Sequence, residues 1–168
     1  YFACYGSNTL SGTLSMPSNM TYFSCGGNNI LSGTLNMSSV LTSFACSGSN
    51  TLTGTLSMPS SLTSFYCAGS NTLTGTLSMP SSLTYFTCWG SNTLSGTLSM
   101  PSSLTSFTCY GSNTLSGYTR STKANNQNHF QLEGLNTMSS TDVDNILLDY
   151  AEVATWAGDK YFKLQGNA

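Results

Sequence analysis

Charged residues are nearly absent from the first two thirds of this sequence. Tyr1 to Thr119 contains no Asp, Glu, Lys or Arg, and all charges of the 168-residue chain lie between Arg120 and Lys163. Only 6% of the residues are charged, against about 25% in ordinary globular domains. A neutral surface of Ser, Thr, Asn and Gly offers no positive patch for phosphate groups, so nucleic acid is excluded as a partner.

Other features that the sequence lacks exclude further classes of function. The chain has no apolar run of about 18 residues, so we expect no membrane span. His129 is the only histidine and no Cys-x-x-Cys pair exists, so neither a zinc site nor a nucleophile with a nearby base is expected. No glycine-rich phosphate loop opens a helix. We therefore expect a protein that is not an enzyme and that uses no cofactor or metal.

What the chain does contain is a repeat. The cysteines fall at 4, 25, 46, 67, 88 and 109, with the same interval at every step. A fixed period of about 21 residues indicates a solenoid, in which each unit forms one coil and buries its apolar side against its neighbours. Because the chain opens inside a repeat, we expect further repeats N-terminal to Tyr1.

The segment 62–82 illustrates one coil. Phe65 and Cys67 have the spacing that points both side chains to one face of a short strand. A corner at 69–71 follows, and from Thr72 onward apolar and hydroxyl residues alternate, which is the pattern of a second strand. Pro80 and two serines close the coil. Stacked coils would thus form two parallel sheets about 4.8 Å from rung to rung.

The cysteines occupy the same position in every coil. We interpret them as a buried ladder of free thiols that act as small hydrophobic residues. Disulfides between rungs are geometrically unfavourable, because stacked Cβ vectors run parallel to one another.

The repeat L-x-x-F-x-C-x-G-x-N-x-L-x-G-x-L resembles the leucine-rich repeat consensus L-x-x-L-x-L-x-x-N-x-L, with Phe and Cys replacing two leucines. The LxGxL segment is similar to the plant type, and PSSL is similar to the short bacterial type. The resemblance covers about residues 1–117 and implies a curved, right-handed solenoid whose first strand lines a concave, partner-binding face. Cys67 to Asn71 is one residue longer than the consensus, so the Asn ladder is expected to be shifted or bulged. A two-sheeted β-solenoid outside this family stays open.

The composition changes after the repeats, and we interpret 118–168 as a C-terminal β-α-β cap. Phe130 and Leu132 predict one strand, and 160–164 predicts another with Phe162 and Leu164 inward. A helix is expected to begin at Ser139 or Ser140 and to end at Gly158. Its expected apolar stripe is Val143, Ile146, Leu147, Tyr150 and Val153. The acidic residues are read as its capping and solvent face, and these are Asp142, Asp144, Asp149, Glu152 and Asp159.

The outward positions of the first strand vary from coil to coil, whereas the inward ones do not. Tyr and Trp set among Ser, Gly and Ala are typical of adaptable binding surfaces. We expect this face to bind a protein or a cell-surface glycan through Tyr5, Tyr22, Tyr66, Tyr85, Trp89 and Tyr110. The simpler alternative is that the rings pair across strands and only stabilise the sheet.

Two further functions stay open. A Thr column at Thr13, Thr34, Thr55, Thr76 and Thr97 resembles the arrays of ice-binding β-solenoids. A purely structural stalk or fibre segment of a surface or phage tail protein is also compatible with neutral coils. Composition and the family resemblance favour an extracellular or virion-surface location.

Overall fold

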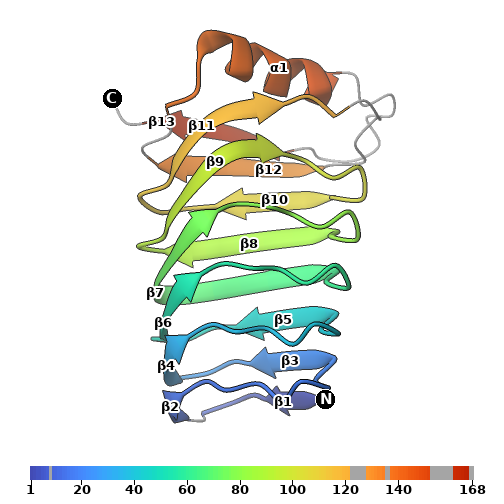
Figure 1. Ribbon diagram of the computed structural model, residues 1–168. Coiled ribbons are helices and arrows are strands. Elements are labelled where there is room, and N and C mark those ends of the chain that lie inside the picture. Colours follow the sequence, from blue (N-terminus) through green and yellow to red (C-terminus); the bar gives the residue numbers. More distant parts are fainter. Residues whose placement is uncertain (8, 122–127, 135–136, 152–160, 167–168) are drawn as a thin grey trace.

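The computed structural model is a parallel-strand β-solenoid of about six turns that ends in one helix (Figure 1). It describes residues 1–168 except 8, 122–127, 135–136, 152–160 and 167–168. The expected repeat solenoid is confirmed. The elements are β1 Phe2–Cys4, β2 Ser11–Thr13, β3 Tyr22–Cys25, β4 Ile30–Thr34, β5 Ser43–Cys46, β6 Thr51–Thr55, β7 Ser64–Thr76, β8 Tyr85–Gly90, β9 Thr93–Ser99, β10 Ser106–Cys109, β11 Thr114–Thr119, β12 His129–Gly134, α1 Ser140–Ala151 and β13 Tyr161–Gly166.

Each coil contributes one strand to each of two parallel layers. Sheet A has the order β1-β3-β5-β7-β8-β10-β12-β13, and sheet B contains β2, β4, β6, β9 and β11. Strand β7 runs through the corner without a break and takes part in both sheets. The expected corner at 69–71 is therefore continuous strand in this coil.

Sheet A is held in register by a ladder of Phe and Cys. Phe44 lies opposite Phe65 and Cys46 lies opposite Cys67, so each residue pairs with its equivalent one full repeat later. The Phe rings stack with centroids 5.2–5.5 Å apart from Phe2 through Phe130 to Phe162. Phe44, Phe65, Phe86 and Phe107 are fully buried. Identical side chains from successive coils thus form one continuous apolar spine inside the solenoid.

The cysteines form the second line of this spine, and all six are free thiols. Cys4 is half-buried and the other five are buried. Burial raises the pKa of the Cys46 and Cys109 thiols to about 12, because an apolar site disfavours the thiolate. The interpretation as a ladder of small hydrophobic residues is confirmed.

Sheet B has a different register from sheet A. Thr55 lies opposite Thr74, whereas its equivalent in the next coil is Thr76, so the pairing falls short of one full repeat. The change of register occurs at the corner, between the pairs Cys67 with Cys88 and Asn71 with Gly90. The expected shift near the Asn ladder is confirmed.

The Asn side chains themselves join the coils at this corner. Each accepts a hydrogen bond from a Leu backbone N–H of the preceding coil, with N···O distances of 2.9–3.2 Å. Asn71, for example, is fully buried and accepts from Leu52. The buried amide oxygen thus satisfies a buried N–H that the change of register removes from the strand ladder.

The two registers make the solenoid curve. Equivalent residues of neighbouring coils lie about 4.8 Å apart in sheet A, where they pair directly. In sheet B they are also displaced by two residues along the strand, so their separation is about 8 Å. Figure 1 shows the corresponding oblique, widely spaced strands β7, β9 and β11. Sheet A, where equivalent residues are closer together, is therefore the inner side of the curve.

Ser and Thr hydroxyl groups connect neighbouring coils by hydrogen bonds to backbone carbonyl oxygens. The Thr84 Oγ1 hydroxyl donates to the Thr63 carbonyl oxygen, and Thr63 donates in the same way to Thr42, at 2.8–2.9 Å. In the proline turn, Ser82 Oγ donates to the Leu62 carbonyl oxygen at 2.6 Å. The many Ser and Thr residues are therefore partly structural, which explains how the stack holds together without charged side chains in residues 1–119.

The cap continues sheet A by two strands. Phe130 and Leu132 of β12 lie opposite Phe107 and Cys109, and β13 adds Phe162 and Leu164. Strand β11 crosses the expected boundary between residues 117 and 118 and pairs with β9. The inward positions expected for both cap strands are confirmed.

Helix α1 contacts β11 and covers the end of the core. Ser139 is its N-cap, because Ser139 Oγ accepts the Asp142 N–H at 3.2 Å and the Asp142 carboxylate accepts the Ser139 N–H. Ile146 and Tyr150 are buried as expected, but Leu147 is 46% exposed, so the expected stripe is wrong at this position. Val153 and the expected helix end at Gly158 lie outside the described residues, as do Glu152 and Asp159.

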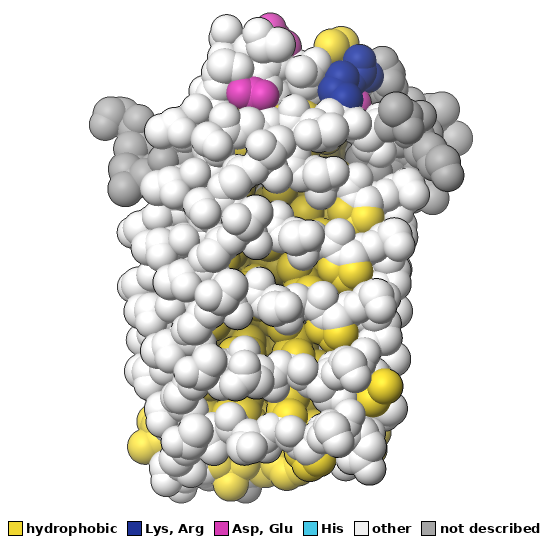
Figure 2. All heavy atoms as spheres, in the orientation of Figure 1, with side chains coloured by type: hydrophobic (Ala, Val, Ile, Leu, Met, Phe, Trp, Pro, Cys, Tyr) yellow, Lys and Arg dark blue, Asp and Glu magenta, His cyan; other side chains and the backbone are white. Residues whose placement is uncertain are grey.

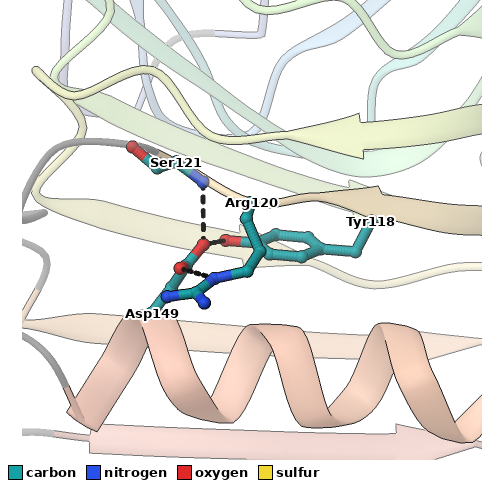
Figure 3. A network of polar contacts seen from close by, with 4 residues as sticks. All are labelled: Tyr118, Arg120, Ser121 and Asp149. Carbon is teal, nitrogen blue, oxygen red and sulfur yellow. Dashed lines mark hydrogen bonds and ion pairs between the residues drawn. The ribbon is translucent and has the colours of Figure 1, made fainter.

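The burial of Asp149 explains why the helix turns a different face to the core from the one that the expected apolar stripe predicts. We expected it on the solvent face, but its residue is only 5% exposed. Its carboxylate accepts from the Tyr118 hydroxyl, Arg120 Nε and the Ser121 N–H, each at 2.8 Å (Figure 3). Burial, together with the hydrogen bond to Asp149, raises the pKa of the Tyr118 hydroxyl. Strand β11 and the residues after it thus hold the helix by a buried carboxylate.

The buried thiols predict a loss of stability at high pH. In the unfolded chain the thiols ionise near their ordinary pKa of 9.0, whereas Cys46 and Cys109 keep their protons until about pH 12. Above pH 9.0 the folded state binds more protons, so the free energy of unfolding falls as pH rises and is unaffected below. Urea unfolding under reducing conditions measures this fall, which should be shallower in Cys46→Ala. An equal slope in the variant contradicts the prediction.

The cap network predicts a second stability effect. Asp149→Asn removes the charge opposite Arg120 and leaves a buried donor or acceptor without its partner, so we expect a loss of about 2 kcal/mol. Asp144→Asn is the matched control, because Asp144 is exposed on the same helix. Urea unfolding compares the two variants, and equal stability of both would show that the network does not hold the cap.

Candidate binding face

The outward positions of sheet A form three columns across the coils. On each strand these are the residue before Phe, the residue after Phe and the residue after Cys, and we call them together the strand face. Because sheet A pairs in register, each column stacks equivalent residues of successive coils. The columns continue onto β12 and β13 of the cap.

On β8 and β10 the residue of the middle column is buried. Thr87 and Thr108 are 2% and 6% exposed although they point outward from the sheet. Tyr85 and Trp89, on the two sides of Thr87, are 37% and 43% exposed. On these two strands a short polar side chain thus lies beside taller aromatic ones, whereas on β7 the middle position is Tyr66.

Three of the predicted aromatic residues contact one another directly. The Tyr66 and Trp89 rings are 6.3 Å apart and tilted, and the Trp89 and Tyr110 rings are 5.6 Å apart in a T-shaped arrangement. Tyr85 lies on the rung next to Tyr66, in the column before Phe. Burial raises the pKa of both Tyr66 and Tyr110. We call Tyr66, Tyr85, Trp89 and Tyr110 the C-terminal cluster.

The other two predicted residues form a separate group with Tyr1. The Tyr1 and Tyr22 rings stack at 4.5 Å, and the Tyr5 and Tyr22 hydroxyl oxygens are 3.4 Å apart. Hydrogen bonds from Ser24 and Tyr22 lower the pKa of Tyr5. The third coil carries only small residues on the strand face, namely Ser43, Ala45 and Ser47. The structure therefore divides the predicted residues into two clusters.

The cap adds residues to the strand face that sequence reasoning missed. His129 and Tyr161 stack at 4.8 Å in the column before Phe. Gln131 Nε2 donates to Glu133 Oε1, and Glu133 pairs with Lys163. The signal was present, since inward Phe130 and Phe162 place the alternate residues outward. The C-terminal cluster is thus continuous with aromatic and polar side chains of the cap.

Among the residues that the structure describes, the charged side chains lie at the cap end of the molecule. Figure 2 shows Lys, Arg, Asp and Glu side chains only near the helix, while the coils below are white with bands of yellow. Among the outward positions of β1 to β13 in sheet A, the acidic and basic side chains apart from His129 are Glu133 and Lys163. The strand face therefore presents rings, hydroxyls and amides with little net charge.

The Thr column of sheet B does not stack as expected. The hydrogen-bonding register places Thr34 opposite Thr53 and Thr55 opposite Thr74, so equivalent threonines are two residues apart along the strands. The Thr55 methyl lies only 2.6 Å from where a Cβ on Gly75 would be, and Gly75 has φ +97. The same contact recurs in the neighbouring coils. These methyl groups pack on the next coil, so the prediction of one in-register column is wrong.

Comparison with known proteins gives no family assignment. No family model matches the chain, and no curated protein matches it. Among the helices of the described residues, none has the length and apolar character needed to cross a membrane.

Ring contacts alone would stabilise the sheet modestly, and this can be measured. A double-mutant cycle of Trp89→Ala and Tyr110→Ala should give a coupling energy of about 0.5–1.5 kcal/mol, as for other aromatic pairs. Urea unfolding of the wild type, both single variants and the double variant supplies the cycle. A coupling above about 3 kcal/mol would exceed the range of such pairs and would make the cluster a structural element.

Proposed function

We propose that the chain is a non-enzymatic binding module that recognises a protein or a glycan through the strand face. The observation that carries the proposal is the C-terminal cluster, where Trp89 is 43% exposed although it sits in contact with Tyr66 and Tyr110. Rigid, amphipathic rings beside small polar residues are typical of recognition surfaces. The concave position of sheet A and the resemblance to leucine-rich repeats support the same function.

We further propose an extracellular or virion-surface location, supported by the neutral, hydroxyl-rich coils and by the family resemblance. A structural stalk is the second candidate function. It is favoured by the hydrogen bonds of Thr hydroxyls and Asn side chains that join neighbouring coils between Leu31 and Asn92. A stalk would need no ligand on the strand face.

An attachment assay distinguishes the two functions. Fluorescently labelled protein is incubated with a panel of bacterial and animal cells and counted by flow cytometry. We expect attachment to at least one cell type and a loss of about tenfold or more when Tyr66, Tyr85 and Trp89 are all replaced by Ser, because truncated aromatic anchors remove most binding energy. The matched control replaces Thr53 and Thr74 of sheet B with Ala. Unchanged attachment of the triple variant, or attachment to no cell type, would contradict the proposal.

A further inference from the structure

We propose that the ligand is a neutral glycan and that it lies across the C-terminal half of the strand face, from Tyr66 to Tyr161. This inference rests on the proposed binding function and adds the class of ligand and its place. It makes the cap strands β12 and β13 part of the site, together with the coils of β7, β8 and β10.

The first argument is the set of exposed rings. Trp89 and Tyr161 are each 43% exposed, and Tyr85 is 37% exposed. Neighbouring rings fix their orientation, since Trp89 meets Tyr110 edge-on and Tyr161 stacks on His129. Both rings thus keep a large exposed fraction while their neighbours hold them in place. The C–H faces of a pyranose sugar pack well on such a surface, which is apolar in the middle and polar at its rim.

The second argument is the polar strip between the rings. Thr87, Thr108 and Gln131 follow one another in the middle column, and all three are at most 8% exposed. They form a polar floor between the rings, and the groups beside them that a ligand can reach are the phenol hydroxyls of Tyr85 and Tyr161, which can both donate and accept hydrogen bonds, as sugar hydroxyls require. Many protein–protein interfaces also carry Met or Arg beside the aromatic rings. The strand face has no Met, Arg, Leu, Ile or Val at its outward positions.

The third argument concerns charge. A sulfated or acidic glycan would need unpaired cations, but Lys163 is paired with Glu133 and no other Lys or Arg lies on the described strand face. The site therefore matches the chemistry of an uncharged sugar chain, and its affinity should change little with salt.

A glycan array with neutral, sialylated and sulfated members tests the proposal. We expect the wild-type protein to bind neutral members, and Trp89→Ala or Tyr161→Ala to lower the affinity about tenfold or more. Trp89→Phe keeps a ring and should retain part of the binding, whereas Thr74→Ala on sheet B should retain all of it. Far-ultraviolet circular dichroism of each variant checks that the solenoid is folded.

Three results would overturn the inference: binding to no neutral glycan, binding to acidic glycans only, or equal binding by wild type and Trp89→Ala. Periodate treatment of the target cells separates this inference from the proposed function. If attachment depends on Tyr66, Tyr85 and Trp89 but survives periodate, the ligand is a protein, and the proposed function stands without the glycan.

Discussion

The pairing of each Phe and Cys with its equivalent in the next coil is the constraint on which the rest of the structure depends. It brings fully buried rings and thiols into one line through the coils and into the cap. A shift by one residue would turn every one of these side chains outward. The same register therefore also decides which residues stand on the strand face.

The second register, in sheet B, gives the solenoid its shape. Asn71 and its equivalents accept the N–H groups of the preceding coil at the corner where the two registers meet. The glycines of sheet B, such as Gly75, admit the Thr methyl of the coil before them. These buried amides and glycines allow equivalent residues of neighbouring coils to lie farther apart in sheet B than in sheet A. The solenoid therefore curves, and the strand face is on the concave side.

Much of the fold could be predicted from the sequence because comparison of equivalent positions in successive coils shows which positions are constant and which vary. The inward side chains, the free thiols and both cap strands followed from spacing alone. A shift at the Asn corner was expected from the long Cys-to-Asn spacing, but its continuation through sheet B as a displacement of two residues could not be predicted, since it arises from backbone geometry. Nor could the buried position of Asp149, which depends on Tyr118 and Arg120 from a distant part of the chain. Of the candidate site, the aromatic residues were predicted, but their division into two clusters depends on the small residues of the third coil.

The most direct test of the account is the free energy of unfolding of Phe86→Ala, measured with urea. Phe86 is in the middle of the ladder and is fully buried between Phe65 and Phe107. Truncation of a buried Phe leaves a cavity and costs about 3–5 kcal/mol, so the account predicts a loss in this range. A loss below about 0.5 kcal/mol, which is typical of surface substitutions, would contradict the stacked ladder and with it the strand face.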